Sequence, residues 1–79
     1  MLQPEAIFVK PIKDYHIFVR FETGEEKIFN VNPYINGTWF GKLKYENYFK
    51  TVHIANQTVE WKDGQDIAPH ELYELSIAK

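Results

Sequence analysis

The sequence predicts an α+β fold: a small, mainly antiparallel sheet of about five short strands, an irregular central loop or short helix, and a C-terminal helix. Three observations favour this class. Apolar side chains alternate with period two from Tyr15 to Phe21, a glycine turn follows at Gly24, and a helical pattern begins at Pro69. The 79 residues are expected to form a single domain, because a chain this short supports one hydrophobic core.

Two strands are predicted near the N-terminus, at residues 6–12 and 15–21. The first contains Pro11, which has no N–H to donate to a ladder, so this strand is predicted at an edge of the sheet or ending at Lys10. Alternate side chains of the second strand share the side that faces the core: Tyr15, Ile17, Val19 and Phe21. The opposite side carries His16, Phe18 and Arg20.

Further strands follow from two turn signals. A third strand is predicted at residues 26–31, because Gly24 can take the positive φ that a hairpin turn needs. Residues 50–61 are predicted to form a hairpin around Asn56 and Gln57, since Asn tolerates the left-handed conformation. All five strands are expected in one antiparallel sheet.

The central segment, residues 33–49, is predicted to be irregular and to cover part of one face of the sheet. A cap at Thr38 would begin a short helix beside Leu43, but Gly41 weakens such a helix by about 1 kcal/mol. The C-terminal helix is predicted from Pro69 to about Ile77, because proline is favoured at the first helical position.

The composition favours a soluble cytoplasmic protein. Nine Lys and Arg against eleven Asp and Glu give a net charge of −2, whereas nucleic-acid binders usually carry a basic face. Cysteine is absent, which excludes disulfides and thiolate metal sites and points to a reducing compartment. No stretch approaches the ~18 apolar residues of a membrane span, and no leader pattern opens the chain.

Four polar residues near the C-terminal helix are the candidates for chemistry: Asp63, Asp66, His70 and Glu71. Their spacing matches no metal motif, and the three histidines lack an H-x-x-x-H arrangement. Asp66 is expected instead to accept backbone N–H bonds around the bend and the entry to the helix. Ser76, the single serine, has no G-x-S-x-G context. We therefore predict no catalytic residue, no metal and no cofactor; a hydrolase using Asp66 and His70 is a remote alternative.

Several sequence features follow one another in a characteristic order. They are the strand Tyr15–Phe21, the turn glycine Gly24, the loop Pro33-Tyr34-Ile35, Leu43 with Phe49, and the closing pattern Trp61-x-x-Gly64-x-Asp66-Ile67-x-Pro69-x-x-Leu72-Tyr73. Over nearly the whole chain this order resembles DUF2442, a family of bacterial domains of unknown function. The pattern differs at Asn30, where a carboxylate is expected. The resemblance implies one of two settings: some members continue into a helix-turn-helix, which is not expected after Lys79, and others resemble partners of small toxin-like proteins.

Exposed aromatic side chains are the best candidates for contact with a partner, because a small domain cannot bury every ring. Phe18 lies on the side of its strand opposite the core, so either a second layer or a partner covers it. The candidate partner-binding residues are Phe18, Arg20, Tyr34, Trp39, Tyr45 and Tyr48.

The leading hypothesis is a cytoplasmic protein-interaction module, the antitoxin-like or adaptor partner of a small toxin-like protein encoded nearby. Recognition would use exposed aromatics or a free strand edge, and self-association is left open. The alternative is a small nucleic-acid-associated regulator. Its phosphate contacts would have to come from a patch of basic side chains: Lys10, Lys13, Arg20, Lys42, Lys44 and Lys50.

Overall fold

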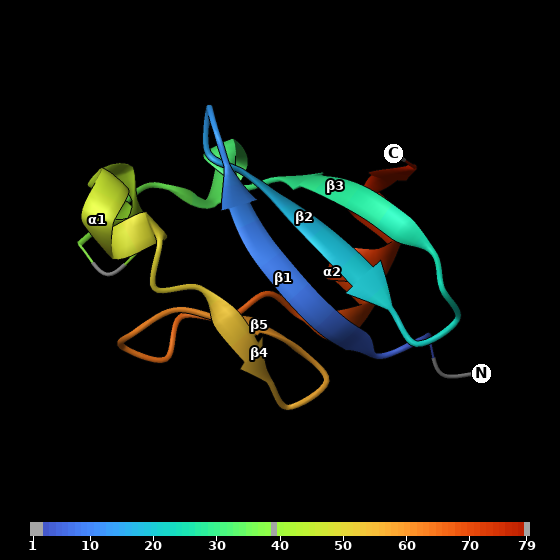
Figure 1. Cartoon of the computed structure of the whole chain (residues 1–79). Coiled ribbons are helices and arrows are strands. Elements are labelled where there is room, and N and C mark those ends of the chain that lie inside the picture. Colours follow the sequence, from blue (N-terminus) through green and yellow to red (C-terminus); the bar gives the residue numbers. More distant parts are fainter. Residues whose placement is uncertain (1–2, 39, 79) are drawn as a thin grey trace.

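The computed structural model describes residues 3–38 and 40–78 and confirms the α+β class. Its main element is a four-stranded antiparallel sheet in the order β1-β2-β3-β6 (Figure 1). The strands are β1 (Ala6–Ile12), β2 (His16–Phe21), β3 (Glu26–Asn30) and β6 (Ile77–Ala78). Helix α2 (Pro69–Leu75) lies behind this sheet in Figure 1, so the view looks onto the opposite face. Within the described residues no helix is long and apolar enough to cross a membrane.

The meander of β1, β2 and β3 is confirmed, with Pro11 inside the edge strand β1. Gly24 has the positive φ that the β2–β3 turn was predicted to need, 94°. The β1–β2 turn is longer than predicted, because Asp14 and Tyr15 both have positive φ, at 62° and 59°. Strand β2 therefore begins at His16, one residue later than the alternation pattern suggests.

The core lies between the inner face of the sheet and α2. Ile17, Val19 and Phe21 of β2 are at most 1% exposed, which confirms the core-facing side predicted from alternation. From α2, Leu72 is fully buried, and the Tyr73 ring meets the Phe21 ring edge-on with ring centres 5.1 Å apart. Helix α2 covers one face of the sheet, as predicted.

The predicted hairpin is formed by β4 (His53–Ala55) and β5 (Thr58–Glu60). Asn56 and Gln57 have φ of 51° and 72°, as the turn requires. The prediction of one five-stranded sheet is wrong, since the described residues form six strands in two sheets. The hairpin makes its own two-stranded sheet because Glu60 of β5 bridges to Asp66, in the loop before α2, while β4 only packs near β1.

The central segment folds into short helical pieces: η1 (Asn32–Tyr34), η2 (Phe40–Lys44), both 3₁₀ helices, and α1 (Glu46–Phe49). Leu43 and Phe49 point from these pieces into the core. The segment therefore covers one end of the inner face, as predicted. Trp39, one of the candidate partner-binding residues, lies outside the described residues.

The C-terminal helix begins at Pro69 as predicted but ends at Leu75. Ser76 takes an extended conformation, and Ile77 then pairs with Ile28 of β3. The capping role expected of Asp66 is wrong: the residue before the helix is Ala68, which has no side-chain cap bond. Asp66 is exposed, and its backbone forms an isolated bridge with Glu60.

Candidate functional site

The outer face of the sheet, opposite α2, carries a shallow groove of about 400 Å³. It exists because Ile17, Val19 and Phe21 point into the core, so the alternate residues of β2 must point away from it. The groove is lined by Phe8, Lys10, Ile12, Phe18, Arg20, Glu26 and Ile28. We call these residues, together with His16 and Ile77 on the same side, the outer face.

An apolar row crosses the outer face at right angles to the strands. Phe18 of β2 pairs with Ile28 of β3, and Ile28 pairs with Ile77 of β6. Directly paired residues of an antiparallel sheet project on the same side with their Cβ atoms about 4.5–5.5 Å apart, so these three side chains form a continuous strip. Ile77 is 71% exposed, and Lys10, the partner of Phe18 on β1, ends the row.

A β-bulge places Phe8 beside this row. The register of β1 against β2 shifts between Ala6 and Phe8, so Ala6 pairs with core-facing Phe21 while Phe8 pairs with Arg20. In a regular strand Ala6 and Phe8 would point to the same side of the sheet, but here they point to opposite sides. Bulges commonly redirect a side chain in this way. Phe8 remains 42% exposed and meets the Phe18 ring edge-on at 6.1 Å.

Charge on the outer face is unevenly compensated. Arg20 donates from Nη2 and Nε to Glu26 Oε2, at 2.8 and 3.1 Å, and its guanidinium carbon lies 5.5 Å from the centre of the Phe8 ring. Lys10 is exposed and makes no side-chain hydrogen bond or ion pair with any described residue. The face thus combines an apolar strip with one cation that has no partner within the described chain.

The six candidate partner-binding residues do not form a single surface. Phe18 and Arg20 lie on the outer face, whereas Tyr45 is 64% exposed at the α1 end of the molecule. Tyr34 packs against Phe29 with ring centres 5.6 Å apart and donates to Glu71 at 3.1 Å. Burial, followed by this hydrogen bond, raises the pKa of Tyr34.

Tyr48 belongs to a polar cluster that closes the α1 end. Its hydroxyl donates to Asp63 Oδ2 at 2.7 Å, and Lys42 reaches the same oxygen at 3.1 Å. The Tyr48 hydrogen bond, and then the Lys42 bond, hold the pKa of Asp63 below its usual range. Asp63 therefore joins α1 and η2 to the loop after β5, which is a structural role.

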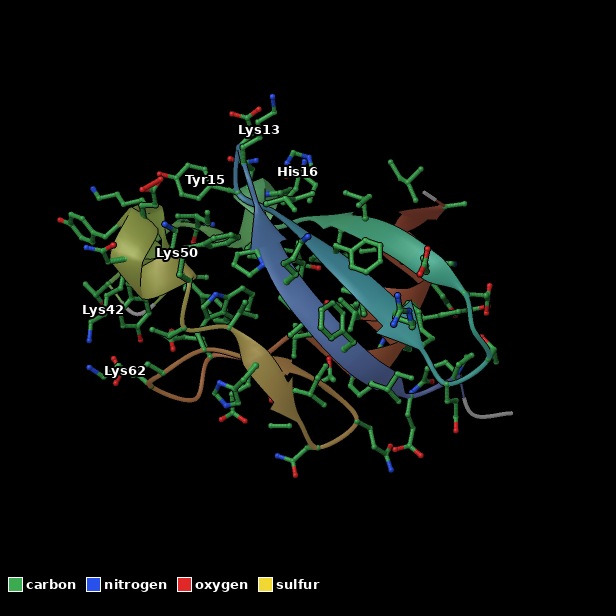
Figure 2. All side chains as sticks on the ribbon, viewed as in Figure 1. Lys13, Tyr15, His16, Lys42, Lys50 and Lys62 are labelled. Atoms are coloured by element: carbon green, nitrogen blue, oxygen red, sulfur yellow. The ribbon has the colours of Figure 1, made fainter. Side chains whose placement is uncertain are left out.

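The basic residues proposed for nucleic-acid contact are split between three places. Lys10 and Arg20 lie on the outer face, away from the others. Lys42 and Lys50 lie around the α1 end and Lys13 at the tip of the β1–β2 turn (Figure 2), and Lys44 belongs to η2 with Lys42. Lys62, which was not among the proposed residues, also lies near the α1 end. Two of these lysines have partners: Lys42 with Asp63 at 3.1 Å, and Lys50 with Glu46 at a longer 3.9 Å.

The polar residues near the C-terminal helix are not brought together as a metal or acid–base site. Asp63 is held by Tyr48 and Lys42, Glu71 accepts from Tyr34, and Asp66 and His70 are exposed. Among residues 3–38 and 40–78, no three His, Cys, Asp or Glu side chains group closely enough to hold a metal ion.

The closing motif Trp61, Gly64, Asp66, Pro69, Leu72 and Tyr73 mainly builds the interior. Trp61 is fully buried and donates from Nε1 to the Phe49 carbonyl at 2.9 Å. Gly64 has φ of 89° in the turn that follows. Tyr73 donates to Glu25 at 2.8 Å, which lowers the pKa of Glu25 and raises that of Tyr73. The motif thus ties α2 to the sheet.

Four apolar members of the outer face were absent from the sequence-based candidates: Phe8, Ile12, Ile28 and Ile77. A usable signal existed for Ile28, because a hairpin centred on the Gly24 turn places it opposite Phe18. No comparable signal existed for Ile77, since its partner strand lies nearly fifty residues earlier in the chain.

The fold and the surface together define a small α+β domain in which a helix covers one face of an antiparallel meander and the described residues leave the other face open. The chain belongs to the family described as protein of unknown function DUF2442, whose model matches residues 6–78. No curated protein and no solved structure matches it significantly.

The expected departure from the family pattern, Asn30, has a clear local role. Its Oδ1 accepts from the Asn32 backbone N–H at 3.0 Å and from Asn32 Nδ2 at 2.8 Å, where β3 gives way to η1. An amide oxygen accepts these bonds as a carboxylate would. Asn32 Nδ2 in turn donates to the Asp14 carbonyl at 2.9 Å, which braces the β1–β2 turn.

Proposed function

We propose that this protein is a cytoplasmic protein-interaction module that docks a partner on the outer face of its sheet. The observation that carries the proposal is the apolar row Phe18, Ile28 and Ile77 with Phe8 beside it, on a sheet whose inner face is already filled by the core. Apolar patches of this kind, rimmed by polar side chains, mark sites of protein interaction.

The energetic reason is the apolar area that remains in contact with water. Phe8 is 42% exposed. If its side chain has an area of roughly 200 Å², covering the exposed part would contribute about 2 kcal/mol at ~25 cal/mol per Å². Ile77, at 71% exposed, offers a similar gain. A partner that covered both residues together with Phe18 would acquire the buried centre that interfaces need.

Docking on the face is better supported than pairing at a strand edge. The start of β1 lies against the β4–β5 hairpin, where the Ala6 N–H donates to the Gln57 carbonyl at 3.3 Å. Farther along β1, Pro11 lacks an N–H. At the other edge β6 is only two residues long. Neither edge offers a long row of backbone groups for an added strand, so side chains of the face are the better contact.

We propose binding rather than catalysis, because the acidic groups closest to a possible site are engaged structurally: Asp63 by Tyr48 and Lys42, and Glu71 by Tyr34. The partner we propose is a separate protein encoded nearby. The resemblance to short family members implies that this protein acts as its antitoxin-like or adaptor counterpart.

The test is co-expression with the product of the neighbouring open reading frame, followed by co-purification at low and high salt. Phe18→Asp and Ile77→Asp should each abolish the complex, because a carboxylate would be buried in an apolar contact. Tyr45→Asp is the matched control, since Tyr45 is also an exposed aromatic but lies at the α1 end. Thermal melts should show that the variants are folded. A complex that survives both outer-face substitutions contradicts the proposal.

The second candidate, a small nucleic-acid-associated regulator, is favoured by one observation: Lys42, Lys50 and Lys62 lie near α1 (Figure 2). The exposed Tyr45 directly precedes this helix. The Lys44 ammonium lies 5.7 Å from the centre of the Tyr45 ring. Against this candidate, Asp63 and Glu46 pair with two of the lysines and reduce the positive potential. It is therefore the weaker proposal. Nucleic-acid binding through lysines should weaken steeply as salt rises, whereas a complex held by the apolar outer face should not.

A further inference from the structure

We infer that the segment docking on the outer face is an amphipathic helix whose apolar stripe is flanked by carboxylates. This inference rests on the proposed function and names the chemistry of the partner. Three features of the described residues support it: the charge of the face, the lack of a carboxylate for Lys10, and the limited edges of the sheet.

The outer face has a small positive charge although the protein is acidic. The chain has eleven Asp and Glu and a net charge of −2, yet the described residues of the outer face include two cations, Lys10 and Arg20, and a single carboxylate, Glu26. Glu26 bonds Arg20 through one oxygen at 2.8 and 3.1 Å. Lys10, at the end of the apolar row, has no described partner. A carboxylate from outside the chain would supply one at the rim of the contact.

A second copy of the chain fits this face less well. In a two-fold contact the same patch meets itself, so the only carboxylates brought to the interface are the two copies of Glu26. Each is already bonded to its own Arg20. A two-fold contact would therefore bring two copies of Lys10 to the interface without a further carboxylate, and an ammonium buried there without a counter-charge is costly. An acidic partner avoids that cost.

The shape of the face favours a helix over a strand. Four strands span three gaps of about 4.8 Å, so the row from Lys10 to Ile77 is about 14 Å wide. A helix with side chains is about 10–12 Å across and presents apolar residues at i, i+3, i+4 and i+7. One helix of about 14 residues laid along the row can therefore cover Phe18, Ile28 and Ile77, with an acidic side chain near its end reaching Lys10.

The experiment is a selection from a displayed library of helical peptides of about 14 residues with a fixed leucine stripe. The positions flanking the stripe vary among Glu, Gln and Lys. The baits are the full-length protein, Ile77→Asp, Lys10→Glu, and Lys62→Glu as a control at an exposed lysine near the α1 end. Affinities of the selected peptides are then measured by calorimetry.

The unaltered protein and Lys62→Glu should enrich Glu beside the stripe, and Lys10→Glu should enrich Lys there. A selected Glu peptide should bind Lys10→Glu about two- to five-fold more weakly, as expected for an exposed ion pair. Ile77→Asp should enrich no peptide. If peptides bind Ile77→Asp as well as the unaltered protein, the outer face is not the docking surface and the proposed function fails. If binding needs Ile77 but shows no Glu preference, or if no peptide is enriched, only the acidic helix is overturned, because co-purification tests the proposed function separately.

Discussion

Replacing Trp61 with alanine should come close to unfolding the domain. Trp61 is fully buried, packs on Phe49 with ring centres 5.9 Å apart, and donates from Nε1 to the Phe49 carbonyl at 2.9 Å. Truncating a buried Trp costs about 3–5 kcal/mol in lost transfer energy and cavity. The Phe49 carbonyl would keep the longer bond from the Val52 N–H, at 3.4 Å.

This loss is large relative to the stability of so small a domain. At about 0.05–0.15 kcal/mol per residue, a chain of 79 residues has a free energy of unfolding of roughly 4–12 kcal/mol. Each kcal/mol shifts the melting temperature of such a domain by about 4–8 °C, so Trp61→Ala should lower it by about 12–40 °C. Trp61→Phe keeps a ring but loses the N–H, and should cost about 1–2 kcal/mol.

Thermal unfolding followed by circular dichroism, with urea unfolding as a second measure, checks the stability losses expected for Trp61→Ala and Trp61→Phe. The control is Lys62→Ala, an exposed neighbour whose removal should change stability by less than about 0.5 kcal/mol. A cooperative melt of Trp61→Ala within a few degrees of the unaltered protein would refute the assignment of Trp61 as the centre of the core.

Four further outcomes are expected. Tyr73 lowers the pKa of Glu25, so this pair stabilises the fold above the usual Glu pKa of 4.5, and its contribution is lost as pH falls through the lower folded value; Tyr73→Phe should therefore make the melting temperature depend less steeply on pH below 4.5. The pKa of Tyr73 is raised above its model-compound value of 10.0, so the same pair should also weaken as pH rises through that raised value, which melts in alkaline buffer would show. Asp66→Ala should change stability by less than about 0.5 kcal/mol, because Asp66 is exposed and caps no helix; a larger loss in urea unfolding would restore a structural role. Duplex or single-stranded DNA should bind no tighter than the non-specific ~10⁻⁴–10⁻⁶ M at physiological salt, and tight, salt-sensitive binding lost on replacing Lys42 and Lys44 would favour the regulator instead.

The sequence by itself determined the features that depend on local geometry. Alternation along β2 identified the core-facing side because successive side chains of a strand point to opposite faces, and Ile17, Val19 and Phe21 are buried there. Gly24 and Asn56 marked their turns because few residues tolerate positive φ. Pro69 marked the start of α2 because proline suits the first helical position. Phe18 was correctly placed on the opposite side of the sheet for the same geometric reason.

Only the tertiary structure decided how distant segments meet. β6 is two residues long and exists because Ile77 reaches Ile28 after the helix ends, a pairing with no local signal. The bulge that sends Ala6 inward and Phe8 outward depends on register with β2. Asp66 was expected to accept hydrogen bonds where α2 begins, but it caps no helix; its neighbour Asp63 instead joins the loop after β5 to Tyr48 and Lys42, which come from a different part of the chain. The outer face therefore emerged from long-range strand pairing, which composition and periodicity do not encode.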